Sequence, residues 1–280
     1  MRIRWIGQIA ILAGVLLLVG GASQAENASS QIAATSKLQA TYDMSLGPFD
    51  LGDFRLTVSF DGQQYTMQAK AKFEILKGLL FRGDGTTRSA GVLTEGGPEP
   101  TVFEVSYKGS DKKEKRFMRF SDGAVSEFSI VPAKRPNPHN IPLNKEQLAK
   151  VLDPLSAAFL SIRSDLPPGD PGLCRKTVRV FDGEQRFDVV LSPKRTDKLP
   201  SGAPSSIPDP VAVCRVKYVP LSGYRPDNAG VKFMTKTNDV EVWLASVPQE
   251  RLYLPYRIVV PTAMGSGSAT LTKVKVKSSQ

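Results

Sequence analysis

Histidine and cysteine are scarce in this chain of 280 residues, which contains one histidine and two cysteines. One histidine cannot supply a metal site with two histidine ligands, and two cysteines cannot form a four-cysteine zinc site. The histidine, His139, lies among three prolines in the stretch 136–142, which is typical of an exposed connector rather than a catalytic site. Ser156 is not in the Gly-x-Ser-x-Gly context of a hydrolase nucleophile. The sequence therefore predicts no metal, no cofactor and no catalytic residue, and it favours a protein that is not an enzyme.

Long hydrophobic runs are also scarce, and the clearest one lies near the start of the sequence. Two arginines precede an apolar run at 9–19, and small residues follow it up to Ala25. A positively charged start, an apolar core and a small-residue site are typical of a secretory signal peptide. We expect residues 1–25 to be removed before Glu26, residues 26–36 to form a flexible tail, and the mature protein to lie in the periplasm. An uncleaved anchor is the alternative, although the run is short for a membrane span of about 20 residues.

The two cysteines, Cys174 and Cys214, would meet an oxidising environment in an exported chain, where they most simply pair with each other. The expected disulfide closes a loop of about 40 residues and restricts the unfolded state. The spacing excludes a Cys-x-x-Cys redox pair, so we interpret the bond as structural. Two buried free thiols are the alternative.

Alternation of apolar and polar residues is the dominant pattern of the mature chain, and it is clearest at 65–74. A period of two indicates strands with one buried and one exposed face. Asp61-Gly62, Asp122-Gly123 and Asp182-Gly183 each separate two such runs, as expected for tight hairpin turns. The runs are 38–46, 54–60, 65–74, 102–107, 115–120, 125–131, 177–181, 186–191, 211–219, 240–245, 253–260 and 269–276.

About twelve to fourteen strands and one helical segment predict an all-β fold, either a large antiparallel barrel or a β-spiral, with a sandwich as the third solution. We expect one domain over 37–277, with a helical insertion at about 145–164 and a Pro-rich surface loop at 194–210. An outer-membrane barrel is the structural competitor. The low aromatic content of 8%, the helical insertion and the cysteine pair favour a soluble body instead.

The helical insertion carries apolar residues at helical spacing, which predicts one apolar stripe. Pro154 interrupts the pattern, whereas Asp153 is a suitable N-cap and proline suits the first helical position. We therefore expect a first short helix that ends near residue 152 and a second that starts at Pro154. The stripe packs on the sheet as core or, as the alternative, forms a lid over a ligand. Its residues are Leu148, Val151, Leu152, Leu155, Phe159 and Ile162.

Four short stretches of the sequence carry a family resemblance. They are Ala40-Thr-Tyr-Asp-Met-Ser-Leu-Gly47 with Gly52, Asp153-Pro-Leu-Ser-Ala157, Val180-Phe-Asp-Gly183 and Leu254-Pro-Tyr-Arg-Ile258. Together they resemble the family called domain of unknown function 3108, over about 38–276. The resemblance implies a secreted envelope protein of proteobacteria, folded as a β-spiral or broad barrel, without known catalytic residues. A related family of periplasmic β-spiral proteins, with a disulfide and a role in envelope integrity, is an analogy at the level of the fold.

Basic residues outnumber acidic ones by 37 to 27, which gives a formal net charge of +10. Phe117 and Phe120 lie among lysines and arginines at 112–119, a pattern also found in proteins that bind single-stranded nucleic acid. Export removes nucleic acid from reach, so we interpret this run as the charged outer face of a strand. Peripheral contact with anionic lipid or cell-wall polymers is a weaker alternative. Gly83-Asp-Gly85 predicts a turn, with no following helix to make a phosphate site.

These patterns favour a non-enzymatic periplasmic envelope protein that supports cell-envelope integrity. The expected partner is an amphipathic ligand, such as a lipid or a lipoprotein, or another envelope protein, and the stripe from Leu148 to Ile162 is the candidate binding element. The alternative is a cell-wall or polysaccharide hydrolase that uses paired carboxylates. The oligomeric state stays open.

Overall fold

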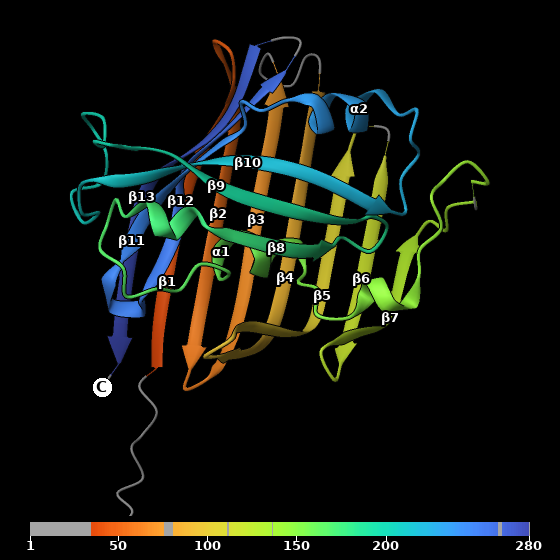
Figure 1. Cartoon of the computed structure of the whole chain (residues 1–280), viewed down its shortest axis with the longest axis horizontal. Helices are drawn as coiled ribbons and strands as arrows, with labels where there is room; N and C mark the ends of the chain where they lie inside the picture. Colours follow the sequence, from red (N-terminus) through yellow and green to blue (C-terminus); the bar gives the residue numbers. More distant parts are fainter. Residues whose placement is uncertain (1–34, 76–80, 111, 136, 263–264, 280) are drawn as a thin grey trace, which may run out of the picture. The chain divides into compact units, whose positions relative to one another are not determined.

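The computed structural model describes residues 35–75, 81–110, 112–135, 137–262 and 265–279, and all 13 of their strands belong to one antiparallel sheet (Figure 1). The predicted signal peptide and most of the predicted tail lie outside the described residues. The strands are β1 (Thr35–Leu46), β2 (Phe49–Asp61), β3 (Gln64–Ile75), β4 (Phe81–Thr94), β5 (Gly97–Gly109), β6 (Lys113–Ser121), β7 (Ala124–Val131), β8 (Lys176–Phe181), β9 (Arg186–Asp197), β10 (Val211–Ser222), β11 (Glu241–Val247), β12 (Leu252–Thr262) and β13 (Gly265–Ser279).

Alternating burial explains why these segments form strands. In β3, Tyr65, Met67 and Ala69 are buried, whereas the residues between them are exposed. The three predicted Asp-Gly turns are confirmed, because each one joins two strands that pair directly. Their glycines all have positive φ, the conformation that such turns require.

The first and last described strands meet in the middle of the sheet. In strand order the sheet runs β7-β6-β5-β4-β3-β2-β1-β13-β12-β11-β10-β9-β8. β1 pairs with β13 from Thr35 opposite Ser279 to Leu46 opposite Gly267. The two edge strands, β7 and β8, are therefore neighbours along the chain but lie at opposite ends of the hydrogen-bonded order.

The sheet curves so strongly that β8, β9 and β10 cross in front of β2 to β5 (Figure 1). The short helix α1 (Pro154–Phe159) contacts β4 as well as β8 and β12. Apolar side chains of both layers and of α1 form one core cluster, which includes Leu56, Met67 and Leu254. The predicted all-β fold with a curved antiparallel sheet is confirmed, and the sheet is not closed by pairing between β7 and β8.

The helical insertion is shorter than expected. A single 3-10 turn, η1, covers Lys145–Leu148, and α1 begins at Pro154 as predicted but ends at Phe159. The residues between them are extended except for Lys150, which lies in a turn, and their backbone groups bond to two hairpins. Lys150 N donates to Gly123 O over 2.7 Å, and Leu152 N donates to Arg179 O over 2.8 Å.

Two elements do not follow the sequence pattern. The expected turn at Gly83-Asp-Gly85 is wrong, because these residues lie inside β4 and pair with β3 and β5. A second helix, α2 (Ala229–Lys236), was not expected; Asn228 caps it by accepting a hydrogen bond from Val231 N. Two further 3-10 turns are η2 (Pro171–Cys174) and η3 (Pro248–Glu250). Among the described residues, every helix is too short or too polar to cross a membrane.

Candidate functional site

A cleft of about 950 Å³ opens where the tips of two hairpins face the start of β8. The β4–β5 and β6–β7 hairpins supply one wall, at Gly96–Pro100 and Ser121–Gly123. The extended segment before α1 and the first residues of β8 supply the other wall. The cleft therefore lies beside the edge strand β8 and at the turn that leads into the other edge strand, β7.

The floor of the cleft is apolar. Phe120, Val151 and Val178 line it and keep 7%, 2% and 6% of their surface exposed. Pro98 and Pro100 are buried beside them, in the β4–β5 hairpin. Such a floor suits the apolar part of a small molecule, with polar groups at the rim to orient it.

Three cations, Lys150, Lys176 and Arg179, lie on the wall formed by the extended segment and β8. Within the part of the chain that the structure describes, none of the three forms an ion pair. Lys176 is half-buried and its amine donates to the carbonyl oxygen of Ser161, and burial lowers its pKa. Two carboxylates, Glu99 and Asp122, lie on the opposite wall, so the cleft has one cationic side.

The backbone of Lys150 is held in the left-handed region, with a φ of 55°. A non-glycine residue in this region costs about 1 kcal/mol, and such strain is more frequent at binding sites. Asp122 has a similar φ of 52°, but it belongs to a tight hairpin turn that favours this conformation. Lys150 lies in a turn after η1, and its N–H is bonded to Gly123 of the β6–β7 hairpin.

A fully buried polar network holds α1 behind the cleft floor. Asp153 caps the helix, since Oδ1 accepts from Leu155 N and Ser156 N at 2.9 and 3.0 Å. Its Oδ2 accepts from Ser89 Oγ at 2.9 Å. The hydroxyl of Ser156 lies 2.9 Å from that of Ser89 and 2.9 Å from that of Tyr65. Because Ser89 gives its only proton to Asp153, Ser156 donates to Ser89 and Tyr65 donates to Ser156.

This network explains the Asp153-Pro-Leu-Ser-Ala157 stretch as a structural anchor. Burial raises the pKa of both Asp153 and Tyr65, with opposing contributions from the hydrogen bonds. All four side chains are at most 2% exposed, and none of them lines the cleft. Gly91 makes room for this arrangement, because a Cβ there would lie 2.8 Å from the Tyr65 hydroxyl and 2.2 Å from Glu99 O.

The predicted apolar stripe is distributed over the core and the cleft. Leu148, Val151, Leu155 and Phe159 belong to the main core cluster. The ring of Phe159 is stacked at 5.7 Å on Phe54, which leaves it fixed in the interior. Ile162 belongs to a second cluster around the disulfide, and Leu152 is half-buried and lines the cleft. Their role in ligand binding stays a prediction, and Val151 and Leu152 are the two that reach the cleft.

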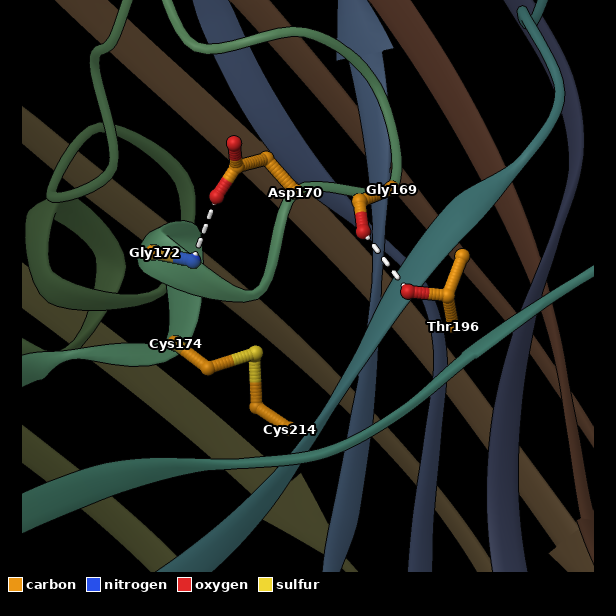
Figure 2. The surroundings of a disulfide bond; sticks show 6 residues. All are labelled: Gly169, Asp170, Gly172, Cys174, Thr196 and Cys214. Atoms are coloured by element: carbon orange, nitrogen blue, oxygen red, sulfur yellow. Dashed lines mark hydrogen bonds between the residues drawn. A yellow bond between two sulfur atoms is a disulfide. The ribbon is translucent and has the colours of Figure 1, made fainter.

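The disulfide between Cys174 and Cys214 is present and joins η2 to β10 (Figure 2). Both cysteines are buried, at 1% and 0% exposure. Asp170 caps η2 by accepting from Gly172 N, and Thr196 of β9 donates to Gly169 O at 2.8 Å (Figure 2). The segment that leads into β8 is therefore fixed to the β9–β10 layer by a covalent bond and a hydrogen bond.

Carboxylates also converge on two arginines, Arg116 and Arg195, and Arg195 contacts Asp197 and Glu241, each at 3.0 Å. Arg116 of β6 contacts Glu114, Asp182 and Glu184 at 2.7, 3.1 and 3.0 Å. Lys134 also contacts Glu184, at 2.5 Å. These carboxylates are used in ion pairs that connect β6 to the β8–β9 turn. His139 is exposed, and no group of three metal-ligating side chains comes together in the described ranges.

The cationic wall of the cleft was not identified from sequence. Arg179 belongs to a strand-like run, where it matches the exposed face, and nothing in the chain order brings 150 and 176 together. The only basic residue next to Val151 and Leu152 in the sequence is Lys150, so no local cluster of basic residues indicates the cationic wall.

The chain is similar to two groups of known proteins. The family described as "Protein of unknown function (DUF3108)" matches residues 41–272. A solved structure described as "Crystal Structure of Beta-barrel-like Protein of Domain of Unknown Function DUF1849 from Brucella abortus" has a TM-score of 0.50 at 12% sequence identity, over 86% of this chain and 98% of that chain. At this identity the likeness concerns the fold alone. No curated protein matches.

Proposed function

Because the chain belongs to the family described as protein of unknown function (DUF3108), a description that assigns no activity, we propose a function from the geometry of the cleft. The protein is a non-enzymatic periplasmic envelope protein that binds an amphipathic, anionic ligand and thereby supports envelope integrity. The observation that carries this proposal is the apolar floor beside three cations that form no ion pair with any described residue. The disulfide is consistent with an oxidising compartment.

The apolar floor and the cationic wall of the cleft together indicate which class of ligand fits. Val151, Val178 and Phe120 offer an apolar contact, and Lys176 and Arg179 offer charge on one side of it. A partly desolvated ammonium group attracts a carboxylate or phosphate more strongly than an exposed one, because less water screens the pair. A fatty acid or the charged end of a lipid meets both requirements.

The test is the binding of 11-(dansylamino)undecanoic acid, a fluorescent anionic amphiphile, to the mature protein. We expect saturable binding to the wild type and at least tenfold weaker binding when Lys150, Lys176 and Arg179 are all replaced by glutamine. A matched control replaces Lys217, Lys232 and Lys236, three exposed lysines outside the cleft, by glutamine. The control has the same net charge as the cleft variant and should bind like the wild type.

Two results would overturn the proposal. One is equal binding by the cleft variant and the control, and the other is absence of saturable binding by the wild type. Equal binding of the methyl ester of the probe would contradict the preference for an anionic ligand and indicate a purely apolar site.

A hydrolase is the second candidate, because Glu99 and Asp122 both line the cleft. Glycoside hydrolysis needs two carboxylates that flank one bond. Release of reducing ends from peptidoglycan by the wild type, lost in both Glu99→Gln and Asp122→Asn, would favour this candidate over a binding protein.

Export is tested separately. N-terminal sequencing of the protein recovered from the periplasm should give Glu26 as the first residue, as the small residues before it predict. Mature protein that still begins at Met1 would contradict the proposed compartment.

A further inference from the structure

The outer face of the sheet carries a continuous field of cations where β13, β1, β2 and β3 lie side by side (Figure 1). Each of these residues is exposed, as expected for the solvent side of an alternating strand. We call this field the basic face. It consists of Lys37, Arg55, Lys70, Lys273, Lys275 and Lys277.

Like charges are placed directly opposite one another in the basic face. Lys37 faces Lys277 across β1 and β13, and Arg55 faces Lys70 across β2 and β3. Directly opposed side chains lie about 5 Å apart, and like charges at this distance destabilise the sheet. Among the described residues, Asp53 is the one carboxylate that pairs with the basic face, through Arg55 at 2.8 Å. Asp43 and Asp53 lie opposite each other across β1 and β2 at one border of the basic face, so the two signs of charge are separated rather than mixed.

A hollow of about 610 Å³ lies next to the basic face and extends it toward β5. Lys37 and Arg88 lie at this hollow, with Glu104 as its carboxylate. The rest of its polar lining consists of neutral hydrogen-bonding side chains, among them Thr57, Ser59, Thr66 and Gln68. The hollow shares no lining residue with the cleft.

We propose that the basic face and the hollow form a binding surface for an acidic polysaccharide. Exposed ammonium and guanidinium groups pair with the carboxylate, sulfate or phosphate groups of such a chain. The hydroxyl and amide side chains of the hollow donate to and accept from sugar hydroxyls. Successive lysines of β13 lie about 6.7 Å apart along the strand, so the surface meets an extended polymer at several points.

The arrangement favours a polysaccharide over an anionic membrane. A membrane-binding surface presents large apolar side chains together with its cations. The exposed large apolar side chains of the described residues, such as Phe49 and Phe233, lie outside the basic face. Neutral hydroxyl side chains between the cations suit sugars better than acyl chains.

The test is the binding of the mature protein to polygalacturonate, with neutral dextran and phosphatidylglycerol vesicles as comparison probes. We expect binding to polygalacturonate that weakens as salt is added, because exposed charges are screened. Replacement of Lys37, Lys275 and Lys277 by glutamine should weaken it roughly tenfold, at about twofold to threefold for each cation. The matched control is again the variant with Lys217, Lys232 and Lys236 replaced by glutamine, which has the same net charge.

The folded state provides a second readout. Because Lys37 and Lys277 repel each other, the variant that loses binding should melt at the same temperature as the wild type or higher. Equal loss of binding in the control would show that net charge alone is responsible and would overturn the proposal. Preference for the vesicles, or absence of binding to polygalacturonate, would also overturn it. None of these three results affects the proposal for the cleft, which is tested with a different probe and a different binding variant.

Discussion

The two places where distant parts of the sheet come together are built differently. At the first, β1 and β13 pair along 12 residues of β1. At the second, β7 and β8 approach each other without pairing, and isolated bridges through Ala149 and Leu152 occupy the gap. Side chains complete the second junction, with Phe128 edge-on to Phe181 at 5.2 Å and Arg116 bonded to the β8–β9 turn.

The difference shows where this fold has room for a ligand. A backbone ladder satisfies donors and acceptors along its whole length and leaves no opening between strands. A junction of isolated bridges and side chains satisfies backbone donors and acceptors only at a few residues. The cleft opens beside two of these residues, Lys150 and Leu152. The β1–β13 junction is therefore the continuous part of the sheet, and the β7–β8 junction is the part that has room for a ligand.

The largest expected effect concerns the apolar filling between the two layers. Phe159→Ala should destabilise the protein by about 3–5 kcal/mol, because it removes a buried ring that packs on Phe54 and Tyr42. Phe49→Ala is the control, since Phe49 is 48% exposed, and it should change stability little. Urea unfolding measures both. A small effect of Phe159→Ala would mean that α1 is a lid rather than core.

The disulfide fixes the chain on the β8 side of the gap and should have the next largest effect. Replacement of Cys174 and Cys214 by serine should lower the free energy of unfolding by about 2–4 kcal/mol, because the unfolded chain gains freedom. Thermal melting of the variant and of the reduced wild type should agree. An unchanged melting temperature would contradict the structural role.

The ion pairs across the gap should contribute less. Arg116→Gln should cost about 2 kcal/mol, because it removes the one cation that all three carboxylates share and leaves Lys134 to pair with Glu114 and Glu184. Arg119→Gln on the same strand removes one exposed ion pair with Glu127, and its cost should be below about 1 kcal/mol. Equal costs for the two substitutions, measured by urea unfolding, would show that Arg116 does not hold the junction.

The smallest effect is a pH dependence from the buried network behind the gap. Burial raises the pKa of Asp153, so the folded state holds this proton more tightly than the unfolded state. Its contribution to stability is present below the ordinary carboxyl range and is lost as the pH rises through the raised value. Asp153→Asn keeps the cap without this titration, so its stability relative to the wild type should rise from pH 4 to pH 7. A difference that falls over this range would contradict the assignment.

The strands of the sheet were more predictable from sequence than the cleft and the segment that lines it at the β7–β8 junction. Alternation of apolar and polar residues identified twelve strands, because consecutive residues of a half-buried strand face opposite sides of the sheet. The three Asp-Gly turns were identified between such strands. β4 was missed because Gly83, Gly85 and Gly91 interrupt the pattern, and the space beside Gly91 is occupied by β5 and by the Tyr65 hydroxyl. Asp153 and Pro154 marked the start of α1. The left-handed turn at Lys150 and the cationic wall involve contacts with hairpins that are distant in sequence, and no local sequence pattern indicates such contacts.

The most direct measurement of ligand binding in the cleft is hydrogen exchange by mass spectrometry with and without 11-(dansylamino)undecanoic acid. We expect slower exchange in the presence of the probe at Lys150–Leu152 and at Lys176–Arg179, which form the cationic wall. We expect no change along β1 and β13, which are already paired throughout. Protection that appears at β1 and β13 while the cleft wall stays unchanged would contradict binding in the cleft.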